Sequence, residues 1–144
     1  MEKYFEDVQV RWSDMDPNLH LRHSVYYDWG ALCRLNFFAQ HGLTPETMNK
    51  LNTGFILFRE ECVFKKEIRM GDKVKIDIQI LWSKADFSRV SIQHEIYKNE
   101  NILSAILTVD GAWINIRERK LTAPPEIIHK IFDDAPRHVN FKWM

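Results

Sequence analysis

The strongest constraint on the fold is one change of periodicity along the chain. From Ser24 to about His41, apolar residues recur at the spacing of a helix. From residue 55 to residue 116, the pattern is that of strands joined by short turns, and residues 74–82 alternate without a break. One long helix followed by consecutive strands predicts an α+β domain in which an antiparallel sheet wraps around one long central helix.

The other segments fit a single domain. Residues 4–12 alternate and predict an N-terminal strand, and Pro45 begins a short helix over 45–52. Pro124 and Pro125 end the sheet before a short helix at 126–132, and the segment after Pro136 has no clear pattern. The expected strands of the sheet are 55–66, 74–82, 90–96 and 102–116. Because no repeat or linker interrupts the 144 residues, we expect one domain over 1–144.

The helix at 24–41 is apolar on two sides, which indicates that it is largely buried. Ser24 is placed to cap its start and Gly42 to end it. Gly30 lies inside this helix, where it costs about 1 kcal/mol relative to Ala. We therefore expect a close approach of the helix to a sheet or a partner chain at Gly30.

Composition narrows the classes of function. The chain has 20 basic and 20 acidic residues, so it lacks the basic surface of nucleic-acid-binding proteins. No apolar run approaches the roughly 20 residues that cross a bilayer, and the acidic N-terminus is unlike a signal peptide. Cys33 and Cys62 alone give no disulfide framework. These features predict a cytoplasmic protein with reduced thiols that binds neither nucleic acid nor membrane.

The loop between the first strand and the long helix concentrates groups that can do chemistry. Asp14, Asp16, Asn18, His20 and His23 fall within ten positions and lead directly into the helix. The start of a helix offers unpaired N–H groups that can stabilise an oxyanion, and a nearby carboxylate can attack a carbonyl or activate water. The alternative is a loop of turn residues, with Asp14 or Asp16 in an Asx turn and Asn18 in a left-handed conformation.

The segment DMDPNLHLRHSVYY resembles the thioesterase signature of the hotdog superfamily. That signature has an aromatic-x-Asp-x-Asp start, a His four residues after the second Asp, and a Tyr six residues further on. The matching positions here are Trp12, Asp14, Asp16, His20 and Tyr26. Residues 16–20 are also similar to the Asp-x-Asn-x-His arrangement of acyl-carrier-protein (ACP) thioesterases. The element order, with the turn at 71–72, is similar to the 4-hydroxybenzoyl-CoA thioesterase-like group.

The resemblance implies a hotdog-fold hydrolase that cleaves an acyl-CoA or acyl-ACP thioester without a metal or cofactor. It implies that Asp16 is the catalytic nucleophile or general base, assisted by His20 and Asn18. The backbone N–H of His23 would be the oxyanion donor, and Tyr26 would close the pocket. Relatives pair their sheets, which implies a homodimer or homotetramer with the active site between subunits.

Two departures from the signature lie in the loop. Leu19 replaces a common Gly, and Arg22 with His23 replaces a frequent Asn pair.

The sequence gives weaker support for a functional role of residues outside the loop. Phe55 and Phe58 are candidate substrate-binding residues in an acyl tunnel, although most such aromatics are core. Four basic residues are candidates for contact with CoA phosphates, with a solvated surface as the alternative: Lys65, Lys66, Arg69 and Lys73. His94 and Cys33 are expected in the core. His20 and His23 lack the further ligands that a metal site needs.

Three other functions stay open. A hotdog hydratase or dehydratase would act on acyl thioesters, but the Gly/Pro-rich surroundings of its catalytic residue are missing. A non-catalytic acyl-binding hotdog protein would keep the pocket, and Asp16 with His20 argues against it. A ligand-binding cone of strands around a helix would make Asp16 an ordinary loop acid.

Overall fold

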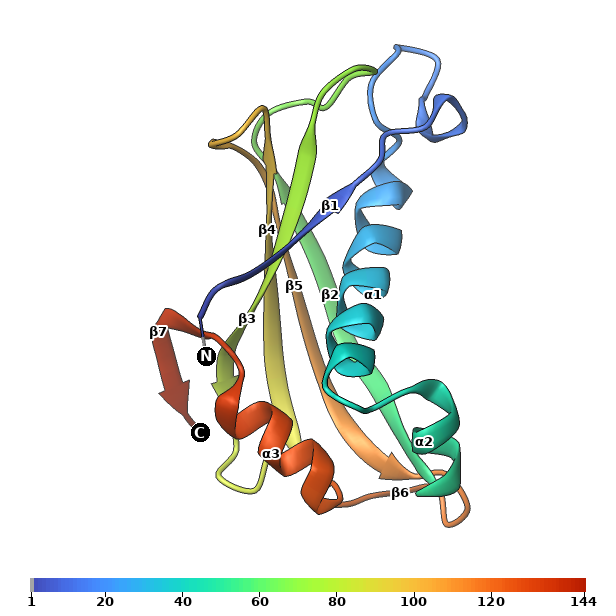
Figure 1. Cartoon of the computed structure of the whole chain (residues 1–144), viewed down its shortest axis with the longest axis vertical. Coiled ribbons are helices and arrows are strands. Elements are labelled where there is room, and N and C mark those ends of the chain that lie inside the picture. Colours follow the sequence, from blue (N-terminus) through green and yellow to red (C-terminus); the bar gives the residue numbers. More distant parts are fainter. Residues whose placement is uncertain (1) are drawn as a thin grey trace.

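The computed structural model describes residues 2–144 and contains one curled sheet with a long helix lying lengthwise against it (Figure 1). The strands are β1 (Tyr4–Val8), β2 (Thr53–Phe64), β3 (Val74–Ser83), β4 (Arg89–Lys98), β5 (Ile102–Asn115), β6 (Lys120–Leu121) and β7 (Arg137–Trp143). The helices are the 3-10 helix η1 (Trp12–Asp14), α1 (His23–Gln40), α2 (Pro45–Lys50) and α3 (Glu126–Asp134).

The sheet has the order β1-β3-β4-β5-β2, with β6 beside β5 and β7 beside β3. All strand pairs are antiparallel except β3 with β7. This curled antiparallel sheet around one long helix is the hotdog architecture expected from the sequence. Four of its strands are those predicted between residues 55 and 116, because their side chains alternate between the core and the opposite face.

The sequence pattern missed the last strand and extended the first too far. β7 pairs in parallel with β3, and such long-range pairing leaves little local signal in a polar segment. β1 ends at Val8, not at residue 12, because Trp12 already begins η1. The carboxylate of Asp14 accepts the N–H of Arg11, which turns the backbone out of the strand direction.

Helix α1 begins at His23, one residue before Ser24, which the sequence predicted to cap it. Arg22 is the residue before the helix, and the hydroxyl of Ser24 accepts a hydrogen bond from Arg22 Nε at 3.0 Å instead of capping. At the other end, Gly42 adopts a φ of +89°, a conformation that favours glycine after a helix. The capping expected of Ser24 is therefore wrong, and the helix start keeps free N–H groups.

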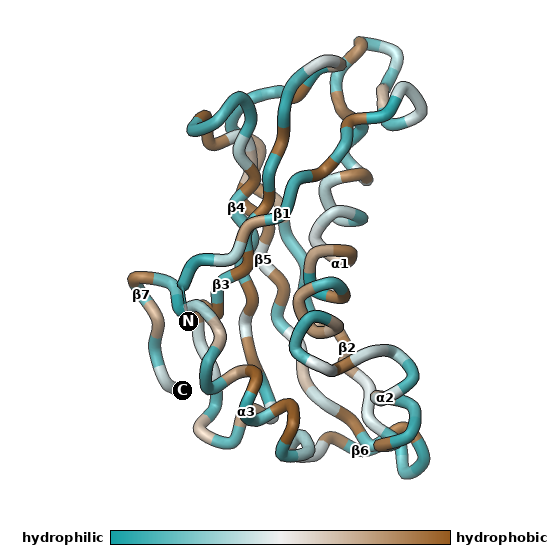
Figure 2. The backbone as a smooth tube through the Cα atoms, in the orientation of Figure 1, coloured by the Kyte–Doolittle hydropathy of each residue, from teal (hydrophilic) through white to brown (hydrophobic). Residues whose placement is uncertain are grey.

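One face of α1 packs on the sheet and the other stays open in the single chain. Val25, Cys33 and Phe37 are buried, whereas Leu32 and Leu35 are 47% and 40% exposed. Hydrophobic and hydrophilic residues alternate around the turns of the helix (Figure 2). The expected burial of both sides is wrong for one chain, because one sheet covers only one side of a helix. No helix within residues 2–144 is long and apolar enough to cross a membrane.

Gly30 lies where α1 crosses the sheet. A Cβ atom added there would be 2.1 Å from Cδ2 of Leu107 on β5 and 3.4 Å from Cδ2 of His94 on β4. His94 is fully buried and its Nδ1 donates to the backbone oxygen of Asp77 at 2.8 Å. Burial lowers the pKa of His94 to about 3, so the ring stays neutral and accepts from Arg34 on α1. The expected close approach at Gly30 and the core position of His94 are both observed.

We expect Gly30→Val to lower the free energy of unfolding by roughly 1–3 kcal/mol, because overpacking displaces Leu107 and α1 together. Ala31→Val is the matched control, since Ala31 is exposed on the same helix and should lose only about 0.5 kcal/mol of helix propensity. Urea unfolding of both variants measures the difference. Equal losses in the two variants would show that the helix does not approach the sheet closely at Gly30.

Candidate active site

Asp14 holds the loop that precedes α1. Its side chain is buried, with 2% of its surface exposed, and Oδ2 accepts the N–H of Arg11 at 2.9 Å. Its backbone oxygen accepts the N–H of Arg22 at 2.8 Å. These bonds tie both ends of the loop together, so Asp14 has a structural role.

Asp16 has one carboxylate oxygen fixed by its own loop. Oδ1 accepts the N–H groups of Asn18 at 2.9 Å and His20 at 3.1 Å. The backbone N–H of Asp16 donates to His20 O at 2.8 Å. No hydrogen bond among residues 2–144 engages Oδ2, so Asp16 forms the Asx turn with one oxygen while the other has no hydrogen-bond partner there.

Leu19 takes the conformation that a glycine would take more easily. Its φ is 65°, in the left-handed region, and its side chain is 72% exposed. A side chain in this region costs roughly 1–2 kcal/mol. The N–H of Leu19 donates to Asp16 O at 3.0 Å, which closes the turn. Leu19, a departure from the signature, therefore closes the turn at a cost in stability.

A cavity of about 310 Å³ brings together four of the predicted site residues: Asp16, His20, His23 and Tyr26. Tyr26 packs edge-on against Phe64 with ring centroids 5.0 Å apart, and both rings line this cavity. Burial raises the pKa of Tyr26 to about 12, so its phenol stays neutral at physiological pH. Tyr26 thus forms an apolar wall of the cavity.

His23 begins α1 at the same cavity. The first N–H groups of a helix have no acceptor within the helix, and no side chain caps this start. Such N–H groups, with the positive end of the helix dipole, can stabilise a developing oxyanion. The oxyanion-donor role that the resemblance implies for the N–H of His23 stays a prediction.

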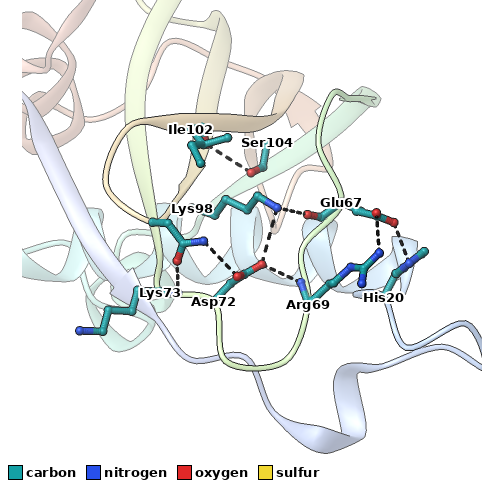
Figure 3. Close-up of polar contacts among 9 residues, drawn as sticks. His20, Glu67, Arg69, Asp72, Lys73, Lys98, Ile102 and Ser104 are labelled. Carbon is teal, nitrogen blue, oxygen red and sulfur yellow. Dashed lines mark hydrogen bonds and ion pairs between the residues drawn. The ribbon is translucent and has the colours of Figure 1, made fainter.

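Glu67 is a cavity residue that the sequence did not indicate. Its Oε2 lies 2.7 Å from Nε2 of His20, and its Oε1 accepts from Arg69 at 2.9 Å (Figure 3). The contact arises because residues 20–21 pair with 68–69: His20 bridges Arg69, and the N–H of Leu21 donates to Ile68 O. No local pattern reveals a pairing between segments so far apart in the sequence.

Three predicted residues lie outside this cavity in the single chain. The side chain of Asn18 is exposed, and only its backbone N–H contacts Asp16. Phe55 packs on Trp113 at 5.0 Å and lines a separate groove with Arg34 and Phe38. Phe58 is 50% exposed, with the Arg89 guanidinium 4.7 Å from its ring centroid. The substrate-binding roles of Phe55 and Phe58 stay predictions.

The thiols offer no nucleophile at this site. Cys33 is fully buried, and burial raises the pKa of the Cys62 thiol to about 11. Both are therefore neutral and unreactive at physiological pH. Within residues 2–144, no group of three or more His, Cys, Asp or Glu is arranged to hold a metal ion.

Comparison with known proteins identifies the family. A model of the thioesterase-like superfamily matches residues 10–132, so the chain belongs to this superfamily. No curated protein matches the sequence closely enough to count as a relative.

Several solved structures share the fold of this chain at low sequence identity. A Staphylococcus aureus protein solved with CoA is 20% identical with a TM-score of 0.83, over 96% of this chain and 89% of that one. A 1,4-dihydroxy-2-naphthoyl-CoA thioesterase from Synechocystis is 17% identical with a TM-score of 0.81, over 92% and 97%. A Thermus thermophilus thioesterase, complexed with coenzyme A and Zn, is 21% identical with a TM-score of 0.74, over 89% and 90%. These likenesses show the hotdog fold, and the family match supports thioester hydrolysis as the general activity.

We expect Leu19→Gly to raise the free energy of unfolding by about 1 kcal/mol, because glycine adopts the left-handed region without a Cβ clash. Leu51→Gly is the matched control: Leu51 has a φ of −85°, so the same change there should be destabilising. Denaturant titration compares both variants with the wild type. A loss of stability in Leu19→Gly as large as that in Leu51→Gly would contradict the strain at Leu19.

Proposed function

We propose that this protein hydrolyses an acyl-CoA thioester to a free carboxylic acid and CoA. The observation that supports this most strongly is the free oxygen of Asp16 in the same cavity as the uncapped start of α1. A thioester carbonyl needs an oxyanion donor and a group that attacks it or activates water. The helix start and Asp16 supply both.

In the general-base form of the reaction, Asp16 takes a proton from water as the water oxygen bonds to the carbonyl carbon. The carbonyl electron pair moves to oxygen, where the N–H of His23 stabilises the negative charge. Collapse of this intermediate breaks the C–S bond, and the thiolate leaves and takes up the proton. In the nucleophilic form, Asp16 attacks first and water then hydrolyses the mixed anhydride.

His20 and Asn18 have different parts in this proposal. His20 lines the cavity, where its ring can orient the water. The side chain of Asn18 is exposed, so its contribution here is the backbone N–H that fixes Asp16 Oδ1. Tyr26 and Phe64 form the apolar wall against the acyl group.

Two lysines beside the cavity favour CoA over a shorter thiol. The N–H groups of Lys65 and Lys66 both donate to Ser104 O, at 2.8 and 3.0 Å. Two residues of one strand opposite a single residue of the neighbouring strand form a β-bulge, which redirects side chains at the end of a strand. Both side chains line the cavity with Asp16, and neither takes part in the ion pairs among residues 2–144. Their positive charges are free to meet the phosphates of CoA.

The single chain supports a homodimer. β2 ends the strand order, so one edge lacks a neighbour, and it carries four exposed apolar side chains: Leu57, Phe58, Val63 and Phe64. Long apolar edges of this kind are templates for pairing. Antiparallel pairing of β2 with itself would place the start of the partner strand beside the end of this one. Phe55 of a second copy would then approach the cavity at Phe64, which gives the predicted role of Phe55 a physical basis.

The cytoplasm is the proposed location. Cys33 and Cys62 are both free thiols in the structure, as a reducing compartment requires.

We expect Asp16→Asn to lower kcat/KM by about two or more orders of magnitude while the protein stays folded. Asparagine has nearly the same shape but can neither attack as a carboxylate nor take a proton from water. Thiol release from aliphatic and aromatic acyl-CoA esters, and from acyl-ACP, measures the loss. An active wild type matched by Asp16→Asn would rule out Asp16 as the reacting group, and a wild type silent on all these esters would refute thioester hydrolysis.

We expect the double variant Lys65→Ala/Lys66→Ala to raise KM for acyl-CoA about tenfold, which corresponds to about 1.4 kcal/mol of binding. The same acyl group on N-acetylcysteamine has no phosphate, so its KM should not change. Lys130→Ala, on the exposed face of α3, is the control for loss of positive charge. An equal rise in KM for both thioesters would show that the lysines act without contacting phosphate.

A further inference from the structure

Among residues 2–144, only one nitrogen of the His20 ring has a polar partner. Nε2 lies 2.7 Å from Oε2 of Glu67, and no hydrogen bond or ion pair among residues 2–144 involves Nδ1. A carboxylate accepts hydrogen bonds and donates none when ionised. Salt-bridging by Arg69 lowers the pKa of Glu67, so this carboxylate is ionised at neutral pH. Nε2 must therefore carry a proton, which leaves Nδ1 of the neutral ring as an acceptor.

Glu67 is itself fixed by Arg69 in its own segment and by Lys98 at the end of β4. Arg69 donates to Oε1 at 2.9 Å, and Lys98 Nζ donates to the backbone oxygen of Glu67 at 2.6 Å (Figure 3). Lys98 also lies 3.7 Å from Asp72, whose carboxylate accepts the N–H of Arg69 at 2.9 Å. The end of β4 thus braces the segment 67–72, and this segment presents the carboxylate to His20.

The same loop links His20 to the reacting carboxylate. The backbone N–H of His20 donates to Asp16 Oδ1 while its ring contacts Glu67. His20 therefore contacts Asp16 through its backbone and Glu67 through its ring, and so connects the two carboxylates. His20 and Glu67 are 33% and 48% exposed at the side chain, so the ring depends on this contact, more than on packing, for its orientation.

We propose that Glu67 is a positioning residue that holds the His20 ring with Nε2 protonated and Nδ1 free to accept a proton or a water hydrogen in the cavity. This inference rests on the proposed thioester hydrolysis for its catalytic meaning, but the ring state can be tested without activity. The carboxylate acts through His20 and does not itself touch the thioester.

The first test reads the ring directly. NMR spectra of ¹⁵N-labelled protein are recorded at pH values where the ring is neutral. A hydrogen-bonded Nε2–H should then give a downfield proton signal. The loss of this signal in His20→Gln assigns it to His20. Glu67→Ala should abolish this signal, and Glu67→Gln should keep it at a shifted position, because the amide oxygen still accepts a hydrogen bond. Glu126→Ala removes an exposed carboxylate on α3 and should leave the signal unchanged. A proton on Nδ1 in the wild type, or a signal that survives Glu67→Ala, overturns the proposal.

The second test is a double-mutant cycle on an ester that the wild type hydrolyses. Glu67→Ala should lower kcat/KM about tenfold, which is less than the roughly 100-fold or more that a positioned proton-transferring side chain contributes, because Glu67 acts only through His20 and the pair is partly exposed. Glu67→Gln should recover part of this loss. In a His20→Ala background, Glu67→Ala should have no further effect. A full additional loss in that background would mean that Glu67 acts independently of His20, which would contradict the proposal. Inactivity of the wild type would count against the hydrolase function, and the NMR test of the ring would then decide the proposal by itself.

Discussion

The packing of α1 on the sheet at Gly30 is the contact on which the site depends. Without a side chain at residue 30, the helix axis comes close to β4 and β5, and Leu107 fills the space where a Cβ would be. His94 and Arg34 add a buried polar contact between helix and sheet at the same place. Since α1 is rigid and fixed there, its N-terminus has one position relative to the end of β2. The cavity forms between these two points.

The loop before α1 then has little freedom. Asp14 closes it at its ends, and Asp16 closes the turn inside it. Leu19 accepts a left-handed backbone so that this turn can form. Backbone strain of this kind persists where the surrounding structure over-determines the conformation, often at functional sites. The outcome is a carboxylate at the cavity with one oxygen bonded by its own backbone and the other without a hydrogen-bond partner among residues 2–144.

The open face of α1 and the edge of β2 support the proposal that a second copy adds to the walls of the site. Leu32 and Leu35 on α1 and Phe58 and Phe64 on β2 are exposed together with an unpaired strand edge. A second copy would cover these apolar surfaces and extend the cavity wall. Glu67 and the two lysines, by contrast, come from the same chain as Asp16. The proposed chemistry is therefore contained in one chain, while a second copy, if the proposed homodimer forms, would add to the walls for the acyl group.

Periodicity determined the long helix and the four strands after it, because each buries one face and repeats its apolar residues accordingly. The loop motif also named Asp16, His20, His23 and Tyr26, which line one cavity because all four lie close together in the sequence, and their roles stay predictions. Tertiary structure decided what depends on distant segments. It added β7, left Asn18 with only a backbone contact, separated Phe55 and Phe58 from the cavity, and brought Glu67 to His20. Local pattern carries no signal for such contacts, because they follow from how the sheet curls and not from the spacing of neighbouring residues.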